Sequence, residues 1–197
     1  VMSTTWRQAV RHDPEQAKRD ADNRYLWRMN RARLDAEAIR DAMLLVSERL
    51  DRTMGGPSDQ QFAMRPGIHV TPIVACRTGA GNRPRGRRRS VYRFVFRTLP
   101  DPFVDCLDGA DASQLTPARN VSITPLQALA LLNNEFTLVH SRAFAAAIEK
   151  ASADADRRIA DAVERIWGRP PTADEAAEMK AYAHKHGLAN LGRLLFN

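Results

Sequence analysis

Long apolar runs are missing from this sequence of 197 residues. A helix that spans a membrane needs about 20 consecutive apolar residues, and no stretch of the chain approaches that length. Residues 1–6 also lack the basic and then apolar pattern of a secretory signal peptide. We therefore expect this piece of chain to have no membrane among its partners.

Cysteine motifs are missing as well. Cys76 and Cys106 form neither a Cys-x-x-Cys pair nor a Cys-x-x-Cys-His haem attachment site, so we expect no cofactor in this piece. A disulfide between them depends on a Cα separation that the sequence does not give, and two separate thiols are the simpler expectation. His184 and His186 stand two residues apart, on different faces of a helix, so we expect no metal site.

Acidic residues are missing between positions 60 and 100, where nine arginines lie. The net charge of the whole chain is +7, which invites comparison with nucleic-acid-binding proteins. Without the nine arginines, however, 21 basic residues face 23 acidic ones, so the rest of the chain is slightly acidic. The basic character therefore belongs to one local stretch.

Helical patterns occupy most of the chain outside that stretch. Capping residues and apolar periodicity predict six helices, beginning near Asp35, Thr124, Asn134, Ile159, Thr172 and Leu188. We expect the first to end at Gly55 and the second to be short and buried. Residues 24–29 suggest one more short helix.

A small β element is predicted between the helices, with strands near residues 68–74 and 91–97, which are rich in β-branched or aromatic residues. Residues 77–89 form an Arg/Gly-rich loop without periodicity, and we expect residues 77–88 to be mobile. The fold class predicted is mainly α, an irregular helical domain of about six helices with this small β element. Residues 1–22 read as a lead-in from an upstream domain and residues 23–197 as a single C-terminal domain.

Several motifs in order carry a resemblance to a known family. They lie at residues 22–30, 34–41, 53–58, 89–94, 120–129, 168–172 and 194–197. Together they resemble domain of unknown function fifteen fifty-three, also called the planctomycete cytochrome-associated C-terminal domain. Residues 76–86 depart from it, because the resemblance implies a more acidic and aromatic segment there.

The resemblance implies a context rather than a reaction. It places the chain at the end of a large exported, periplasmic or similarly located protein, whose upstream domains include one that carries haem c. Those upstream domains are the expected partners, and a polysaccharide-related ligand is a further possibility. The leading hypothesis is therefore a non-catalytic interaction or structural module.

A dense polar segment supplies the alternative hypothesis. Residues 101–111 contain four aspartates, followed by polar groups, and the candidate site comprises Arg97, Asp101, Asp105, Asp108, Asp111, Arg119 and Asn120. These groups would bind a polar, carbohydrate-like ligand or form a hydrolytic site, although the spacing matches no calcium loop. The structural interpretation is that Arg93, Arg97 and Arg119 pair with the aspartates and close an irregular loop.

The basic stretch supplies a third hypothesis. Its guanidinium groups would neutralise phosphates without sequence preference, and the patch comprises Arg83, Arg85, Arg87, Arg88 and Arg89. The aromatic residues beside it are more simply explained as the buried side of a strand, and no nucleic-acid-binding motif accompanies the charge. We therefore expect nucleic acid to be an unlikely partner.

Overall fold

The computed structural model describes residues 3–60, 62–65, 73–76, 85–95, 101–111 and 119–197. The chain divides into two compact units, unit 1 at Val1–Leu34 and unit 2 at Asp35–Asn197. The mainly helical fold class is confirmed, because the described residues contain eight α-helices and two short strands. The division into a lead-in of 22 residues and one domain stays a prediction.

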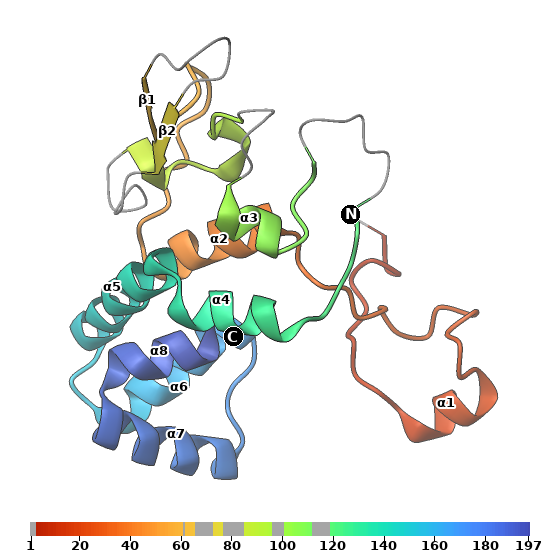
Figure 1. Ribbon diagram of the computed structural model, residues 1–197. Helices are drawn as coiled ribbons and strands as arrows, with labels where there is room; N and C mark the ends of the chain where they lie inside the picture. The colour runs from red at the N-terminus through yellow and green to blue at the C-terminus, as the bar shows by residue number, and fades with distance from the viewer. Residues whose placement is uncertain (1–2, 61, 66–72, 77–84, 96–100, 112–118) are drawn as a thin grey trace. The chain divides into compact units, whose positions relative to one another are not determined.

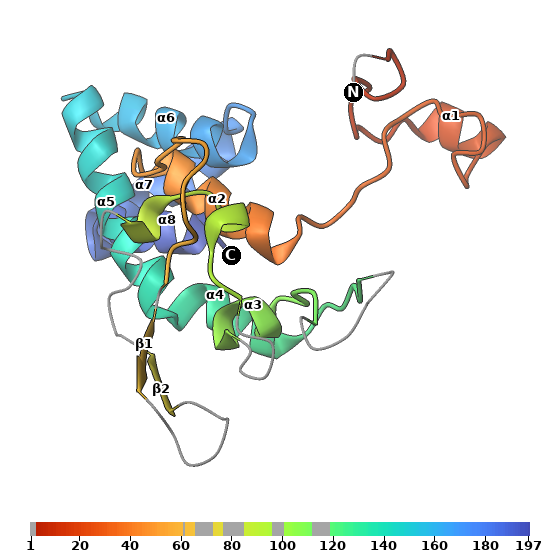
Figure 2. The ribbon, with the colours of Figure 1, turned by 90° about the horizontal axis from the view of Figure 1, so that it is seen from above.

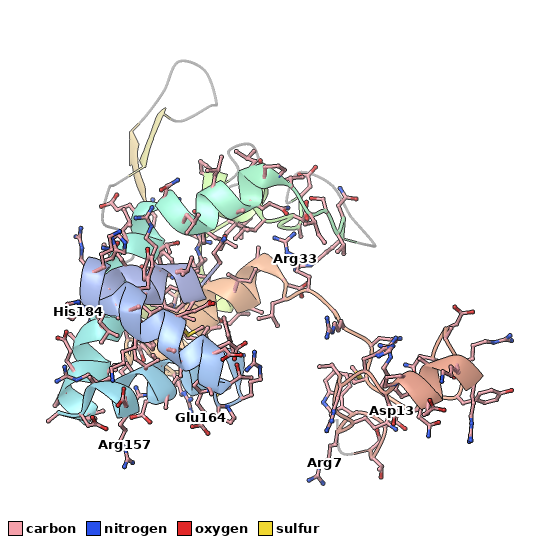
Figure 3. All side chains as sticks on the ribbon, turned by 90° about the horizontal axis from the view of Figure 1, so that it is seen from below. Arg7, Asp13, Arg33, Arg157, Glu164 and His184 are labelled. Atoms are coloured by element: carbon pink, nitrogen blue, oxygen red, sulfur yellow. The ribbon has the colours of Figure 1, made fainter. Side chains whose placement is uncertain are left out.

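Unit 1 contains the helix α1 (Pro14–Arg19), which the sequence did not predict. Asp13 begins it by accepting hydrogen bonds from the backbone N–H groups of Glu15 and Gln16, and Figure 3 labels this residue at the helix start. The short helix predicted at residues 24–29 is wrong, since these residues form turns and bends. Buried Asp20 and Asn23 bind the backbone there and compete with a helical path.

Unit 2 opens with α2 (Ala36–Val46), whose apolar face contains the predicted Met43. The prediction that this helix continues to Gly55 is wrong. Ser47 Oγ donates to the Met43 carbonyl at 2.7 Å, and Glu48 adopts a left-handed φ of 57°. These local contacts satisfy the carbonyls at the helix end and stop it at Val46.

The remaining predicted helices are confirmed, and their caps explain their limits. They are α4 (Pro125–Asn133), α5 (Glu135–Ala151), α6 (Ala155–Trp167), α7 (Ala173–His186) and α8 (Leu188–Leu195). Thr124 and Thr172 each begin a capping box, and Gly168 ends α6 with φ 69°. The pKa of Glu175 in the second box is lowered to about 2, chiefly because Arg169 donates hydrogen bonds to its carboxylate.

The larger core lies between α5, α6 and α8, with α7 packed on α6 and α8 (Figure 1). Its buried residues are Phe144, Ile148, Ile159, Ala162, Val163, Leu191 and Leu195. Arg157 lies on the opposite, exposed side of α6 and points away from these helices (Figure 3). A smaller core joins α2 to α3 (Pro102–Cys106), and α3 lies beside α4 in Figures 1 and 2.

The β element is a hairpin of β1 (Phe62–Arg65) and β2 (Ile73–Cys76), which pair antiparallel. The predicted strand at residues 68–74 overlaps β2 at its end, while residues 68–72 lie outside the described residues. The predicted strand at residues 91–97 is wrong for its described part, because Ser90–Tyr92 forms a 3₁₀ turn, η3. Among the described residues, no helix has the length and apolar character needed to cross a membrane.

Gly192 tests how tightly α5 and α8 pack. A Cβ added at this position would stand 2.8 Å from Phe144 Cδ1, and Phe144 is fully buried. In an uncrowded helix, Gly→Ala stabilises by about 1 kcal/mol, whereas overpacking of a core costs about 1 to 3 kcal/mol. We expect Gly192→Ala to lower the free energy of unfolding, measured by urea denaturation.

Phe144→Leu replaces the rigid ring with a smaller side chain, whose methyl groups can rotate away from the added Cβ. The loss caused by Gly192→Ala should therefore be smaller in the Phe144→Leu background than in the wild-type chain. A stabilising effect of Gly192→Ala in the wild-type chain would contradict this close approach.

Candidate functional site

The predicted polar segment does not converge on one point within the described residues. Asp101 and Asp108 each bind a different part of unit 2, while Asp105, Asp111 and Asn120 are exposed. Arg97 lies outside the described residues, so the predicted ligand site as a whole stays a prediction.

Asp101 caps α3. One carboxylate oxygen accepts from the backbone N–H groups of Phe103 at 3.0 Å and Val104 at 3.2 Å, which begins the helix. The other oxygen forms an ion pair with Arg93, a pairing that the sequence predicted. The carboxylate therefore serves the backbone of α3 and the segment that precedes it.

Asp108 is the centre of a second polar network. Its carboxylate accepts from the backbone N–H of Ser122 at 2.8 Å, from the Ser122 hydroxyl at 2.9 Å and from Gln127 Nε2 at 3.0 Å. Gln127 is buried and also accepts from the Thr124 backbone N–H at 3.1 Å, within the capping box. This network joins Asp108, which follows α3, to Ser122 and Gln127 at the start of α4, and turns these two side chains inward.

Arg119 does not pair with the aspartates. It donates to both oxygens of Glu37 on α2, and the side chains of both residues are more than one third exposed. The pKa of Glu37 is lowered, chiefly by this hydrogen bond. The predicted pairing of Arg119 with Asp101, Asp108 or Asp111 is wrong, because α2 brings a carboxylate from 82 residues away in the sequence.

A buried cation, Arg40 on α2, was missed by the sequence reasoning. Its guanidinium donates to the carbonyl of Gly86 at 2.6 Å and to that of Arg88 at 3.0 Å, and it lies 5.4 Å from the centre of the Phe136 ring. The pKa of Arg40 is lowered to about 10, chiefly because burial disfavours the charge, with repulsion from Arg93 as the next cause. The sequence signal that could have identified Arg40 was its position on the apolar face of α2.

Asp41, next to Arg40, holds the same segment through Ser90. Its carboxylate accepts from the Ser90 backbone N–H at 2.8 Å and from the Ser90 hydroxyl at 2.7 Å. Arg40 also approaches the Ser90 hydroxyl at 3.3 Å. These bonds hold residues 86–90 against α2. They take the place of the strand pairing that the aromatic residues at positions 91–97 predicted.

Arg88 joins this segment to the turn at residues 53–57. Its guanidinium donates to the carbonyls of Pro57 at 2.9 Å and Thr53 at 3.2 Å, and it stacks 3.7 Å from the centre of the Tyr92 ring. The Tyr92 hydroxyl accepts from the Gly55 backbone N–H at 2.7 Å. Gly86 and Arg88 are therefore held by hydrogen bonds, while the mobility expected of residues 77–88 stays a prediction.

The basic patch is divided by these contacts. Arg88 is engaged with main-chain carbonyls, Arg87 is half-buried and Arg89 is exposed. Arg83 lies outside the described residues, and Arg85 belongs to the 3₁₀ turn η2 (Arg85–Arg87). Within the described residues, Arg88 of the basic patch therefore has a structural role. The patch is not simply a set of cations that face a ligand.

An exposed apolar surface borders the Asp108 network. Val121, Ile123, Leu126 and Leu129, named here the α4 stripe, are 77%, 93%, 65% and 54% exposed. Leu126 and Leu129 lie three residues apart, on one face of α4. The prediction that this helix is buried is therefore wrong, because its polar Gln127 faces inward while apolar residues face outward.

Among known protein families, the model of the family described as PSD1, protein of unknown function (DUF1553), matches residues 1–183 of the chain. The chain belongs to this family. No curated protein and no solved structure matches the chain.

The DUF1553 match spans unit 1 and unit 2 as far as α7, so it includes both polar networks. Two of the motifs that carry the resemblance meet in the structure, since Tyr92 of residues 89–94 accepts a hydrogen bond from the backbone N–H of Gly55 in residues 53–58. A third, at residues 120–129, contains Ser122 and Gln127 of the Asp108 network. Part of what identifies this DUF1553 chain therefore supports its architecture directly.

Arg40 and Arg119 provide a test of which arginine supports unit 2. Arg40→Ala removes a buried charge and leaves two carbonyls without their donor, which should lower the free energy of unfolding by about 3 kcal/mol or more. Arg119→Ala removes an exposed ion pair and should cost about 1 kcal/mol or less. Urea denaturation of both variants measures the difference, and an equal or larger loss in Arg119→Ala would refute it.

Proposed function

We propose that this chain is a non-catalytic interaction module that binds neighbouring domains of its own polypeptide through the α4 stripe. The observation that carries the proposal is the exposure of four large apolar side chains on one short segment. Scattered single apolar residues are normal on a protein surface, but a contiguous group of them is typical of an interaction site.

The orientation of the α4 stripe is enforced rather than incidental. Asp108 holds Ser122 inward, so Val121 and Ile123 on either side of it face outward. Gln127 is held inward in the same way, between the outward Leu126 and Leu129. The polar network turns its own side chains inward and leaves the apolar side chains of the α4 stripe exposed. This arrangement favours a binding role for that surface.

The energetics of burial agree with such a role. Removing a large aliphatic side chain from water stabilises by about 1.5 to 3 kcal/mol when burial is complete. Four such side chains are enough to make a substantial contribution to an interface, after the costs of association are met. Because the backbone is already held by hydrogen bonds, little ordering is required on binding.

A non-catalytic role also agrees with the carboxylates. Asp101 caps a helix and pairs with Arg93, and Asp108 accepts bonds from two neighbouring side chains. Groups engaged in this way act as supports for the backbone. Among the described residues, moreover, no three His, Cys, Asp or Glu side chains are grouped to hold a metal ion.

The context of the proposal comes from the resemblance. In it, the module belongs to the C-terminal end of a large exported, cytochrome-associated polypeptide of the planctomycete type, and haem c is carried by an upstream domain. The neighbouring domains that bind the α4 stripe are then those upstream domains.

The test mixes this chain with separately produced upstream domains and measures the dissociation constant by calorimetry. Ile123→Ser combined with Leu129→Ser should weaken binding at least tenfold, because it removes two of the four apolar side chains of the stripe. Folding stability should stay within about 0.5 kcal/mol, since both side chains are exposed.

Leu45→Ser on α2 is the matched control, because Leu45 is exposed but lies outside the stripe. It should leave the affinity unchanged. An unchanged affinity in the double variant would contradict the proposal. So would a dimer of this chain that dissociates in the double variant, because it would assign the stripe to a second copy.

A further inference from the structure

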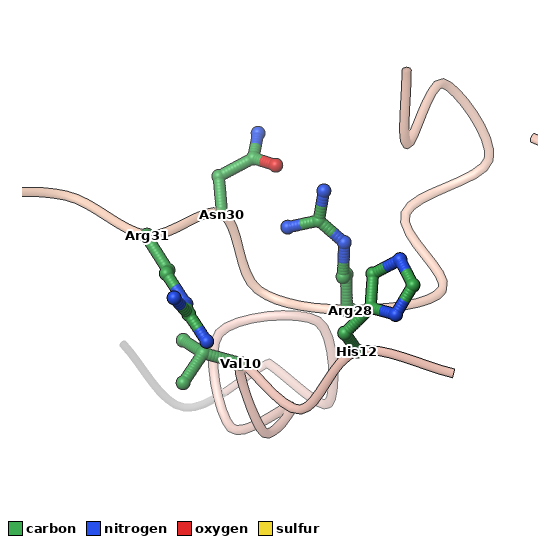
Figure 4. A pocket seen from close by; sticks show the side chains of 5 residues that line it. All are labelled: Val10, His12, Arg28, Asn30 and Arg31. Carbon is green, nitrogen blue, oxygen red and sulfur yellow. The ribbon is translucent and has the colours of Figure 1, made fainter. Parts of the chain in front are cut away.

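Unit 1 contains a pocket built entirely from its own residues. It has a volume of about 530 Å³ and is lined by Val10, His12, Arg28, Asn30 and Arg31 (Figure 4). We name it the unit 1 pocket. All five residues fall within Val1–Leu34, so the pocket does not depend on how the two units are arranged.

The lining of the unit 1 pocket is cationic. Two guanidinium groups and an imidazole contribute to it, and none of its lining residues is acidic. Figure 4 shows the ring of His12 beside the Arg28 side chain, with Asn30 projecting to the same side as Arg28. Guanidinium groups bind carboxylate, sulfate and phosphate oxygens with two parallel hydrogen bonds, so the chemistry favours an oxyanion.

The cations of the unit 1 pocket are not neutralised by the part of the protein that the structure describes. Neither Arg28 nor Arg31 forms an ion pair there, although exposed acids are present elsewhere in unit 1. Arg28 Nε is buried without a hydrogen-bond partner, and the guanidinium rests 5.2 Å from the centre of the Trp27 ring. A cation held against an aromatic face and kept apart from carboxylates is poised for an external anion.

The pocket is also pre-formed by a buried side chain that does not line it. Asn23 donates from Nδ2 to the Arg28 carbonyl at 2.8 Å and to Asn30 Oδ1 at 2.9 Å, and its oxygen accepts from the Arg28 backbone N–H at 3.2 Å. Asn23 adopts a left-handed φ of 57° to make these bonds. Because the Asn30 oxygen is occupied, the amide of Asn30 offers its NH₂ group as a donor.

A second set of bonds joins the two chain segments that line the pocket. The Met29 backbone N–H donates to the Ala9 carbonyl at 3.1 Å, which ties residues 28–31 to residues 10–12. Trp27 Nε1 donates to the Asp20 carbonyl at 2.9 Å, and Asp20 accepts from the backbone of Arg24 and Tyr25. The backbone that carries the binding groups is thus held in place before a ligand arrives, which lowers the entropic cost of binding.

We propose that the unit 1 pocket binds a small organic oxyanion, whose carboxylate, sulfate or phosphate group contacts Arg28 and the Asn30 amide, while Arg31 adds positive charge to the lining. The volume is within the range of about 300 to 1,000 Å³ typical of ligand pockets, and it exceeds what a bare inorganic ion needs. Val10 supplies an apolar wall for the organic part. This assignment is independent of the α4 stripe, which lies in unit 2.

The test uses four probes that share one ring, namely benzoate, phenyl sulfate, phenyl phosphate and neutral benzyl alcohol. Binding to the full chain is followed by calorimetry and by the fluorescence of Trp27, which Arg28 and His12 contact. At least one of the three anions should bind, and the preferred one identifies the oxyanion class. Benzyl alcohol should bind at least tenfold more weakly.

Arg28→Gln is the decisive variant, because Asn23 holds only the backbone of residue 28 and the loop should keep its shape. It should weaken binding of the preferred anion at least tenfold. Arg19→Gln, an exposed arginine of α1 outside the pocket, is the matched control and should change nothing.

Three results would overturn the proposal: equal binding of benzyl alcohol and the anions, an unchanged affinity in Arg28→Gln, or equal affinities for phenyl phosphate and inorganic phosphate. The last would reduce the site to one for a bare ion. Proton resonances of the folded core, recorded for each variant, separate a lost site from a lost fold.

Discussion

The buried guanidinium of Arg40 is the interaction on which the organisation of unit 2 depends. A cation taken out of water is costly unless hydrogen bonds replace its hydration, and Arg40 obtains them from the carbonyls of Gly86 and Arg88. Those carbonyls come from a stretch that has little apolar surface of its own to bury. Arg40 therefore converts a polar, glycine-containing segment into a packed part of the fold.

Once that segment is fixed, further contacts follow from it. Arg88 is placed to hold the turn at residues 53–57, and Ser90 is placed to bind Asp41. Arg93 then lies beside Asp101 and supports the start of α3. The excess of arginine in this region is partly explained by such contacts, because an arginine can satisfy several carbonyls at once where regular strand pairing is missing.

The sequence predicted the elements whose causes are local. The capping boxes at Thr124 and Thr172, the cap at Asn134 and the glycine at position 168 all depend on neighbours within four residues, and the structure confirms each. The errors arose where a distant partner decided the outcome. Residues 90–92 have strand propensity, yet Asp41 and Arg40, about 50 residues away, hold them in a 3₁₀ turn.

The difference between local causes and distant partners also explains which features of the candidate sites the sequence predicted. The density of aspartates correctly marked a polar region, but spacing did not reveal that Asp108 binds forward to Ser122 while Arg119 binds back to Glu37. Hydropathy predicted a buried α4. This prediction failed because an apolar sequence does not indicate whether the surface that covers a helix belongs to the same unit. The unit 1 pocket carried no sequence signal beyond basic residues near Trp27, since its shape depends on the left-handed backbone of Asn23.

Units 1 and 2 use one physical device in two places. In each, a polar side chain binds the backbone of an irregular segment, buried Asn23 in unit 1 and half-buried Asp108 in unit 2, and both residues adopt a left-handed φ. Such a conformation is unfavourable for a residue with a side chain, so it persists only where several hydrogen bonds hold it. The side chains presented nearby are cationic in unit 1 and apolar in unit 2. Selection for binding acts on outward side chains that a stable backbone presents, which is why we assign function to the segment beside Asn23 and to the α4 stripe, rather than to the helices of the larger core.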